Sequence, residues 1–240
     1  MPKPPKELII DYTFTFENGK TKKFSIRLDP VNLNLITEKK EAYPDWTRLS
    51  HNQCPNCPLN EAEHPRCPVA VNLTDVMDAF KDGISFEEVD VEIKTEARTF
   101  VKHTALQYGV YSIIGIYMVA SGCPVMDKLR PMVKTHLPFA TLDETIIRAV
   151  STYLMAQFFL YKKGKKPDWD LKKLVDVYEQ IHIVNTSFFK RIKDIQIEDA
   201  NLNAVVHLDC FTHFANMSLE ETELKELEGP FAAYLNDPAL

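Results

Sequence analysis

Two hydrophobic periods divide the chain, and this division constrains its fold more than any other feature. Over residues 8–29 apolar and polar side chains alternate on both sides of Asn18-Gly19. Alternation around an Asn-Gly pair predicts a β-hairpin with one wet face. A further extended segment is expected near 86–101, where valine and isoleucine alternate with charged residues. The rest of 69–240 repeats its apolar residues every three to four positions, which predicts helices.

Local sequence signals mark where several of the expected helices begin and end. Thr141-Leu-Asp-Glu144 is a capping box at the start of one helix, and Gly229-Pro230 is a stop signal for the last. Another apolar stripe is expected to break near Asn185. The expected helices cover residues 68–80, 104–121, 124–136, 141–161, 169–196 and 199–217, with a last one from Ser218 to Gly229. The sequence therefore predicts an α+β fold: a mainly helical bundle with a small antiparallel sheet, made of the N-terminal hairpin and one later strand, in a single domain over 1–240.

Charge and hydropathy exclude some classes of protein. The net charge of −6 and the pI of about 5.7 argue against a nucleic-acid binder, because phosphate neutralisation needs a concentrated basic surface. The apolar stretch 105–121 is shorter than a membrane span and contains Gln107, so it predicts a buried central helix. The N-terminus lacks the apolar stretch of a signal peptide, so we expect a cytoplasmic protein whose five cysteines are thiols or ligands rather than disulfides.

Cysteine-proline pairs occur in the segment 30–68 and at one distant position, Cys123-Pro124. Four of the five cysteines are followed directly by proline: Cys54, Cys57, Cys67 and Cys123. The first two have the C-x-x-C spacing that lets two thiolates bind one ion from a single turn. The fifth, Cys210, is expected to be a core residue of its helix.

The positions of Cys67 and Cys123 add an electrostatic argument. Each precedes a proline at the first position of an expected helix, where the helix dipole and free N–H groups favour a thiolate. Together with Cys54 and Cys57 they would complete a tetrahedral metal site that pins the 50–67 loop to the central helix. His64 could instead replace Cys123 as the fourth ligand, and His51 is a further candidate.

The sequence is compatible with more than one metal. Zinc is the leading candidate, because it accepts four cysteines, or three and a histidine, without redox chemistry. A [4Fe-4S] cluster is the alternative, since it too is held by cysteine thiolates. A third interpretation has no metal and treats the cysteines as small buried hydrophobes in proline-rich turns.

Two other classes of function compete with a metal-binding protein. One is a thiol-dependent enzyme or redox switch that uses Cys123, with His136 or Lys128 tuning its pKa and Cys67 as the resolving thiol. The other is a non-catalytic module that binds a protein partner through the acidic outer face of the sheet, with no role for nucleic acid or membrane. The residues of that face are Asp11, Glu17, Asp90 and Glu92.

Several motifs also resemble a known family. The stretches CPNCPL, HPRCPVAVNL and SGCPVMDKLRPM, which include the CPxCP, CPVA and GCPVMDKLRPM motifs, are similar to an uncharacterised bacterial family, a domain of unknown function. The resemblance extends over roughly residues 8–215. It implies a bacterial cytoplasmic origin and one common architecture, and it implies no activity.

Overall fold

The N-terminal hairpin forms as the alternation predicts. The computed structural model describes residues 6–38, 40–195, 198–218, 227–237 and 239. Strands β1 (Leu8–Phe16) and β2 (Thr21–Leu28) pair antiparallel, with Leu8 opposite Leu28. Gly19 takes a φ of +78°, a conformation that glycine adopts without steric penalty. The even-numbered apolar residues from Ile10 to Phe16 are buried, so the predicted phase of the strand is confirmed.

The sheet has one more strand than the sequence predicts. β3 (Glu88–Lys94) and β4 (Thr99–Ala105) complete the order β2-β1-β3-β4, and each neighbouring pair is antiparallel. The expectation of one later strand is therefore wrong. β4 escaped prediction because it lies at the edge, where only Thr104 is buried, and it lacks the alternation that burial of one face imposes.

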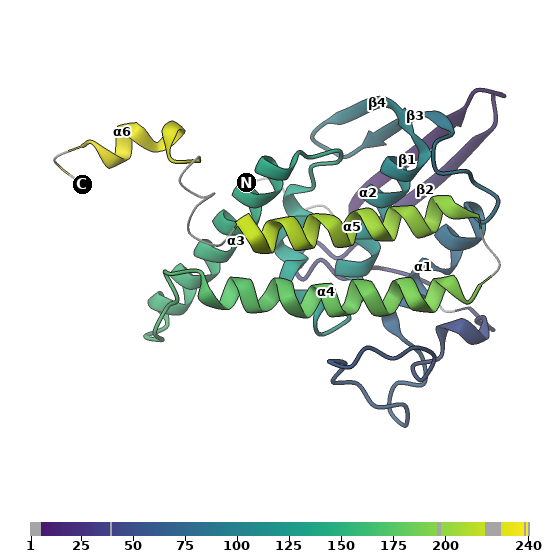
Figure 1. The fold of residues 1–240 in the computed structure, drawn as a ribbon, viewed down its shortest axis with the longest axis horizontal. Helices are drawn as coiled ribbons and strands as arrows, with labels where there is room; N and C mark the ends of the chain where they lie inside the picture. The colour runs from purple at the N-terminus through teal and green to yellow at the C-terminus, as the bar shows by residue number, and fades with distance from the viewer. Residues whose placement is uncertain (1–5, 39, 196–197, 219–226, 238, 240) are drawn as a thin grey trace.

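The helices form the remainder of the α+β fold. They are α1 (Pro68–Ala79), α2 (Leu106–Ala120), α3 (Leu142–Lys162), α4 (Lys172–Lys193), α5 (Asp199–Ser218) and the short α6 (Ala232–Leu235). In Figure 1, α4 and α5 lie side by side, and α2 lies between α5 and the sheet. The predicted capping box is present: the Glu144 N–H donates to Thr141 Oγ1, and the Thr141 N–H donates to the Glu144 carboxylate.

Three of the helix predictions differ from the structure or concern residues that the structure does not describe. The helix expected over 124–136 is the 3-10 helix η2 (Met126–Thr135); in an α-helix the ring of Pro131 would clash with the carbonyl four residues earlier. α4 continues through Asn185, whose buried amide donates to Thr212 Oγ1 at 3.0 Å. Residues 219–226 of the expected helix Ser218–Gly229 lie outside the described residues, and the 3-10 helix Gly229–Phe231 follows them.

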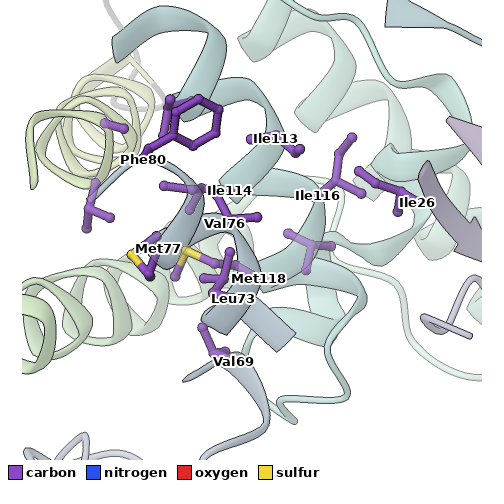
Figure 2. Packing of buried hydrophobic residues seen from close by; sticks show 14 of the residues in the cluster. Ile26, Val69, Leu73, Val76, Met77, Phe80, Ile113, Ile114, Ile116 and Met118 are labelled. Atoms are coloured by element: carbon purple, nitrogen blue, oxygen red, sulfur yellow. The ribbon is translucent and has the colours of Figure 1, made fainter. Parts of the chain in front are cut away.

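Part of the hydrophobic core lies where α1 packs against α2. Figure 2 shows apolar side chains of the two helices interleaved; labelled among them are Leu73, Val76, Met77, Ile113, Ile114 and Met118. All six are at most 2% exposed, which confirms α2 as the buried central helix. No helix within the described residues is long and apolar enough to cross a membrane.

The two glycines inside α2 predict opposite effects of the same substitution. A Cβ on Gly109 would lie 2.6 Å from the Phe14 ring and 3.0 Å from Val91, both fully buried. A Cβ on Gly115 would meet only Leu208, at an ordinary 3.5 Å. We expect Gly109→Ala to lower the free energy of unfolding by about 2 kcal/mol through overpacking. Gly115→Ala should raise it by up to about 1 kcal/mol through helix propensity. Urea denaturation checks this, and equal effects would contradict the packing of α2 on the sheet.

Candidate metal centre

The C-x-x-C segment forms a turn that is fixed to helix α4. The Cys57 N–H donates to the Cys54 carbonyl at 3.0 Å, which closes the turn between the two thiols. From the same turn, the Asn56 side-chain amide donates to the Gln180 backbone and side-chain oxygens, both at 2.9 Å. The loop therefore presents Cys54 and Cys57 from a backbone held against a long helix.

Cys67 and Cys123 occupy the starts of two further segments. Cys67 is the N-cap of α1 with Pro68 at the first helical position, as predicted, and its N–H donates to the Thr47 carbonyl at 2.8 Å. Cys123 follows Gly122, whose φ of +86° turns the chain at the end of α2. It leads into η2 rather than an α-helix, with its N–H donating to Ser121 Oγ at 3.2 Å.

All four predicted cysteines line one small cavity. Its volume is about 20 Å³, which is room for a single water-sized particle. Cys67 and Cys123 are 9% and 8% exposed, and Cys54 and Cys57 are half-buried. The other residues that line the cavity are Leu59, Pro68, Val69, Val125, Val184, Phe188 and Arg191. The remote Cys123 thus meets the 50–67 loop, as the sequence predicts.

The four thiols line one cavity but are not arranged around a common centre. Within the described residues, no group of three or more His, Cys, Asp or Glu side chains is positioned so that it could hold a metal ion. Each cysteine has a single side-chain torsion, and rotation between its staggered wells moves Sγ without moving the backbone. Metal binding at this cavity would require the cysteine side chains to adopt other rotamers than those in this structure.

The alternative histidine ligands lie away from this cavity. His51 Nε2 lies 3.3 Å from the Asp194 carboxylate at the end of α4, which accepts a hydrogen bond from the Asn52 side chain at 2.7 Å. His64 is exposed. Neither is among the described residues that line the cysteine cavity. The fifth cysteine, Cys210, is exposed on α5, so its expected place in the core is wrong.

Burial, rather than the helix N-termini, dominates the electrostatics of the thiols. Burial raises the pKa of Cys54 to about 11, partly offset by the nearby Ser187 hydroxyl. Burial also raises the pKa of Cys123, although the backbone N–H groups of Met126 and Val125 oppose it. These N–H groups act in the direction that the sequence argument predicts, but desolvation outweighs them. Without a metal, Cys123 is therefore a protonated thiol at neutral pH and not a low-pKa nucleophile.

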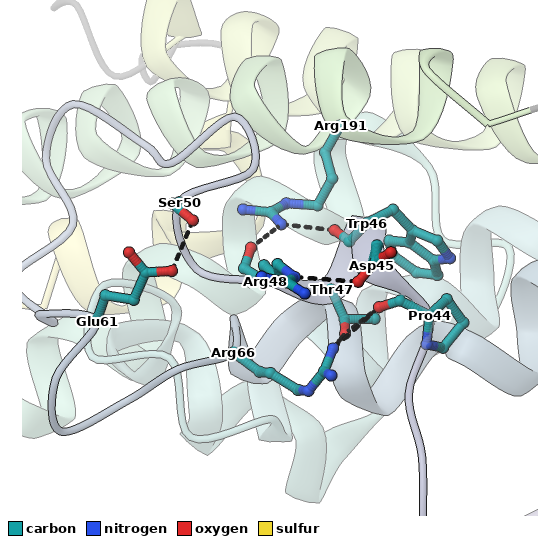
Figure 3. Close-up of polar contacts among 9 residues, drawn as sticks. All are labelled: Pro44, Asp45, Trp46, Thr47, Arg48, Ser50, Glu61, Arg66 and Arg191. Atoms are coloured by element: carbon teal, nitrogen blue, oxygen red, sulfur yellow. Dashed lines mark hydrogen bonds and ion pairs between the residues drawn. The ribbon is translucent and has the colours of Figure 1, made fainter.

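Arg191 is the main residue of the site that sequence reasoning missed. Its side chain extends from α4 into the loop (Figure 3) and is only 2% exposed. The guanidinium donates to the carbonyls of Trp46 at 2.7 Å and Arg48 at 2.6 Å, with a longer contact to Leu49 at 3.3 Å. Among the described residues no carboxylate forms an ion pair with it. Burial lowers the pKa of Arg191, and the thiols of Cys67, Cys54 and Cys57 oppose this.

The residues expected to tune Cys123 lie elsewhere. His136 Nε2 is hydrogen-bonded to the Tyr12 hydroxyl at 2.7 Å, and His136 lines a different cavity beside α2. Lys128 lines a third cavity, between η2, α3 and α4. Neither contributes to the described walls of the cysteine cavity. A thiol enzyme built from Cys123 with either residue therefore has no geometric support.

The comparisons with known proteins supply a family and no activity. A family model described as Domain of unknown function (DUF6901) matches residues 10–232, which is most of the chain. The protein belongs to this DUF6901 family. The match confirms the resemblance to an uncharacterised family that the motifs indicate. No curated protein and no solved structure matches this DUF6901 chain.

Proposed function

We propose that this DUF6901 protein binds a metal through the thiolates of Cys54, Cys57, Cys67 and Cys123. The observation that carries the proposal is the convergence of all four on one cavity, including Cys123, which is 56 residues beyond Cys67 in the chain. They come from three separate segments. If these residues were only small buried hydrophobes, cysteine would not be required in all three segments. Yet each segment places cysteine at this cavity, and no methionine lines it among the described residues.

The buried charge of Arg191 supports this proposal. A buried guanidinium without a carboxylate partner is costly, and its three carbonyl acceptors supply dipoles but no net negative charge. Four thiolates around a divalent cation carry a net charge of −2 by simple addition. That charge, next to Arg191, would supply the missing counter-charge and would in turn be stabilised by the guanidinium.

Zinc is the metal that fits this cavity best. A volume of about 20 Å³ admits one ion, whereas a cluster of eight iron and sulfur atoms would have to push the apolar walls apart. Four protein ligands leave no open coordination position, so we assign the zinc a structural role. It would fasten the 50–67 loop to the start of α1 and to the turn between α2 and η2.

A partner-binding role through the acidic sheet face has weaker support. On that face His103 Nδ1 lies 2.8 Å from Asp90, and Lys94 Nζ lies 2.9 Å from Glu92. The face thus neutralises part of its own charge. These contacts match a solvated surface at least as well as a docking surface for a basic protein.

Serine substitution separates a metal site from a set of buried thiols. We expect the wild-type protein, expressed in zinc-supplemented medium, to retain one zinc per chain after gel filtration. Cys123→Ser should bind zinc roughly 100-fold more weakly or worse, because it removes a direct ligand. Cys210→Ser is the matched control: it makes the same chemical change at an exposed cysteine outside the cavity, and it should keep its zinc. Elemental analysis and titration with a chromophoric chelator measure both quantities.

The same experiment distinguishes the competing interpretations. Brown protein with iron and visible absorption would replace zinc by a cluster on the same four cysteines. Folded wild-type protein without metal, whose four thiols alkylate no faster after chelator treatment, would overturn the proposal. So would a Cys123→Ser protein that retains zinc as tightly as Cys210→Ser.

A further inference from the structure

A second cavity lies beside the central helix and shares no lining residue with the cysteine cavity. It is formed by α2, η2, the loop after η2, the start of α3 and Leu208 of α5, and its volume is about 150 Å³. Most of its walls are apolar, including Ile116, Leu129 and Phe139. A cavity of this size in another protein holds one benzene molecule. The space therefore suits a compact apolar group of similar size.

Arg148 provides the charge at this cavity. It is the one charged side chain among the described residues that form the cavity walls. One of its guanidinium nitrogens donates to the Met132 carbonyl at 3.0 Å, but Nε is buried and has no hydrogen-bond partner within the described structure. No carboxylate in the described ranges forms an ion pair with Arg148. A buried donor without a partner is rare in proteins, and a missing ligand is one physical reason for it.

A neutral hydrogen-bond network forms another part of the same wall. The Tyr12 hydroxyl is bonded to Ser112 Oγ at 2.9 Å and to His136 Nε2 at 2.7 Å. Burial, assisted by the positive charge of Arg148, lowers the pKa of His136 to about 3, so this histidine is neutral at pH 7. The network therefore brings no negative charge to the cavity that could neutralise Arg148. It adds polar atoms that can orient a ligand.

We propose that this cavity binds a small monocarboxylate with a compact apolar body, and that Arg148 binds its carboxylate. A carboxylate accepts from a guanidinium through two parallel hydrogen bonds, which would satisfy Nε and place a negative charge in direct contact with Arg148. Within the described residues the Glu144 carboxylate acts on Arg148 electrostatically but forms no ion pair with it. The apolar walls take the body of the ligand and disfavour small, strongly hydrated anions. This binding site is independent of the proposed zinc, because the two cavities have no residue in common.

Benzoate and its uncharged relative benzamide test the proposal, because they share a ring and differ in charge. We expect titration calorimetry to show saturable binding of benzoate to the wild-type protein. Benzamide should bind with an affinity at least roughly 10-fold lower, or not at all. Arg148→Gln should weaken benzoate binding by a similar factor and leave benzamide unchanged. Lys23→Gln removes the same charge from an exposed position on β2 that lines neither cavity, and should bind benzoate as the wild type does.

A second variant keeps the test decisive if Arg148→Gln does not fold. Ala140→Leu enlarges a residue of the cavity wall while keeping Arg148, and should abolish the binding of both compounds. Isovalerate, with a branched aliphatic body, serves as a second carboxylate probe. The proposal is overturned if neither benzoate nor isovalerate binds saturably, if benzamide binds as well as benzoate, or if Ala140→Leu binds both unchanged. Because zinc content is measured separately, failure here leaves the metal proposal untouched.

Discussion

Arg191→Met is expected to lower the free energy of unfolding by about 3 kcal/mol, because it leaves the carbonyls that Arg191 binds without their donor. Arg191 is 2% exposed and donates to the carbonyls of Trp46, Arg48 and Leu49. Methionine has a similar length and restores some apolar packing, which offsets part of the loss. The remaining penalty is that of buried carbonyl groups without a donor.

A matched control lies two residues further along the same helix. Lys193 is exposed near the end of α4, and Lys193→Met should change stability by no more than about 0.5 kcal/mol. Urea denaturation of both variants gives the comparison. If zinc occupies the cysteine cavity, the loss in Arg191→Met should be larger in the zinc-loaded protein than after chelation. A loss in Arg191→Met no larger than that in Lys193→Met would contradict the role assigned to this arginine.

Acid should destabilise the protein through His136 over a defined pH range. The folded protein holds His136 with a pKa of about 3, mainly by burial, whereas an unfolded chain has a histidine pKa near 6.5. Between these values the unfolded state binds one more proton, so stability falls as pH falls from 6.5 toward 3. The loss approaches about 1.4 kcal/mol per pH unit, or about 2 kcal/mol between pH 6.5 and 4.5.

A variant that lacks only the His136 imidazole isolates this contribution from that of the carboxylates. His136→Asn should flatten the dependence of the unfolding free energy on pH in this range by about 2 kcal/mol. His103→Asn is the contrasting control, because hydrogen bonding to Asp90 raises the pKa of this exposed histidine. What His103 contributes is therefore present at low pH and is lost as pH rises. Wild-type and His136→Asn curves that run parallel from pH 6.5 to 4.5 would show that His136 is not buried in its neutral form.

The sequence predicted correctly those elements that are specified by a few neighbouring residues. The Asn18-Gly19 turn, the Thr141 capping box and the proline after Cys67 each specify a short piece of backbone, and each is found as predicted. The phase of β1 followed from alternation, since one of its faces is buried. The position of Cys123 beside the 50–67 loop was also predictable, because four cysteine-proline pairs in one chain indicate a shared site.

What escaped prediction depends on contacts between distant segments. Arg191 stands among Lys190 and Lys193 and has the pattern of an ordinary basic helix end. Its burial exists only because the loop at Trp46–Leu49 folds over it. Arg148 is partly buried beside η2, where it donates to the Met132 carbonyl. A single sequence contains no signal for such tertiary burial of a charge.

X-ray absorption at the zinc edge tests the four-thiolate site by counting the atoms bound to the metal. For the wild-type chain the account predicts one zinc per chain with four sulfur neighbours at about 2.3 Å. Nitrogen or oxygen in place of any sulfur, or a folded protein that takes up no zinc, would contradict it.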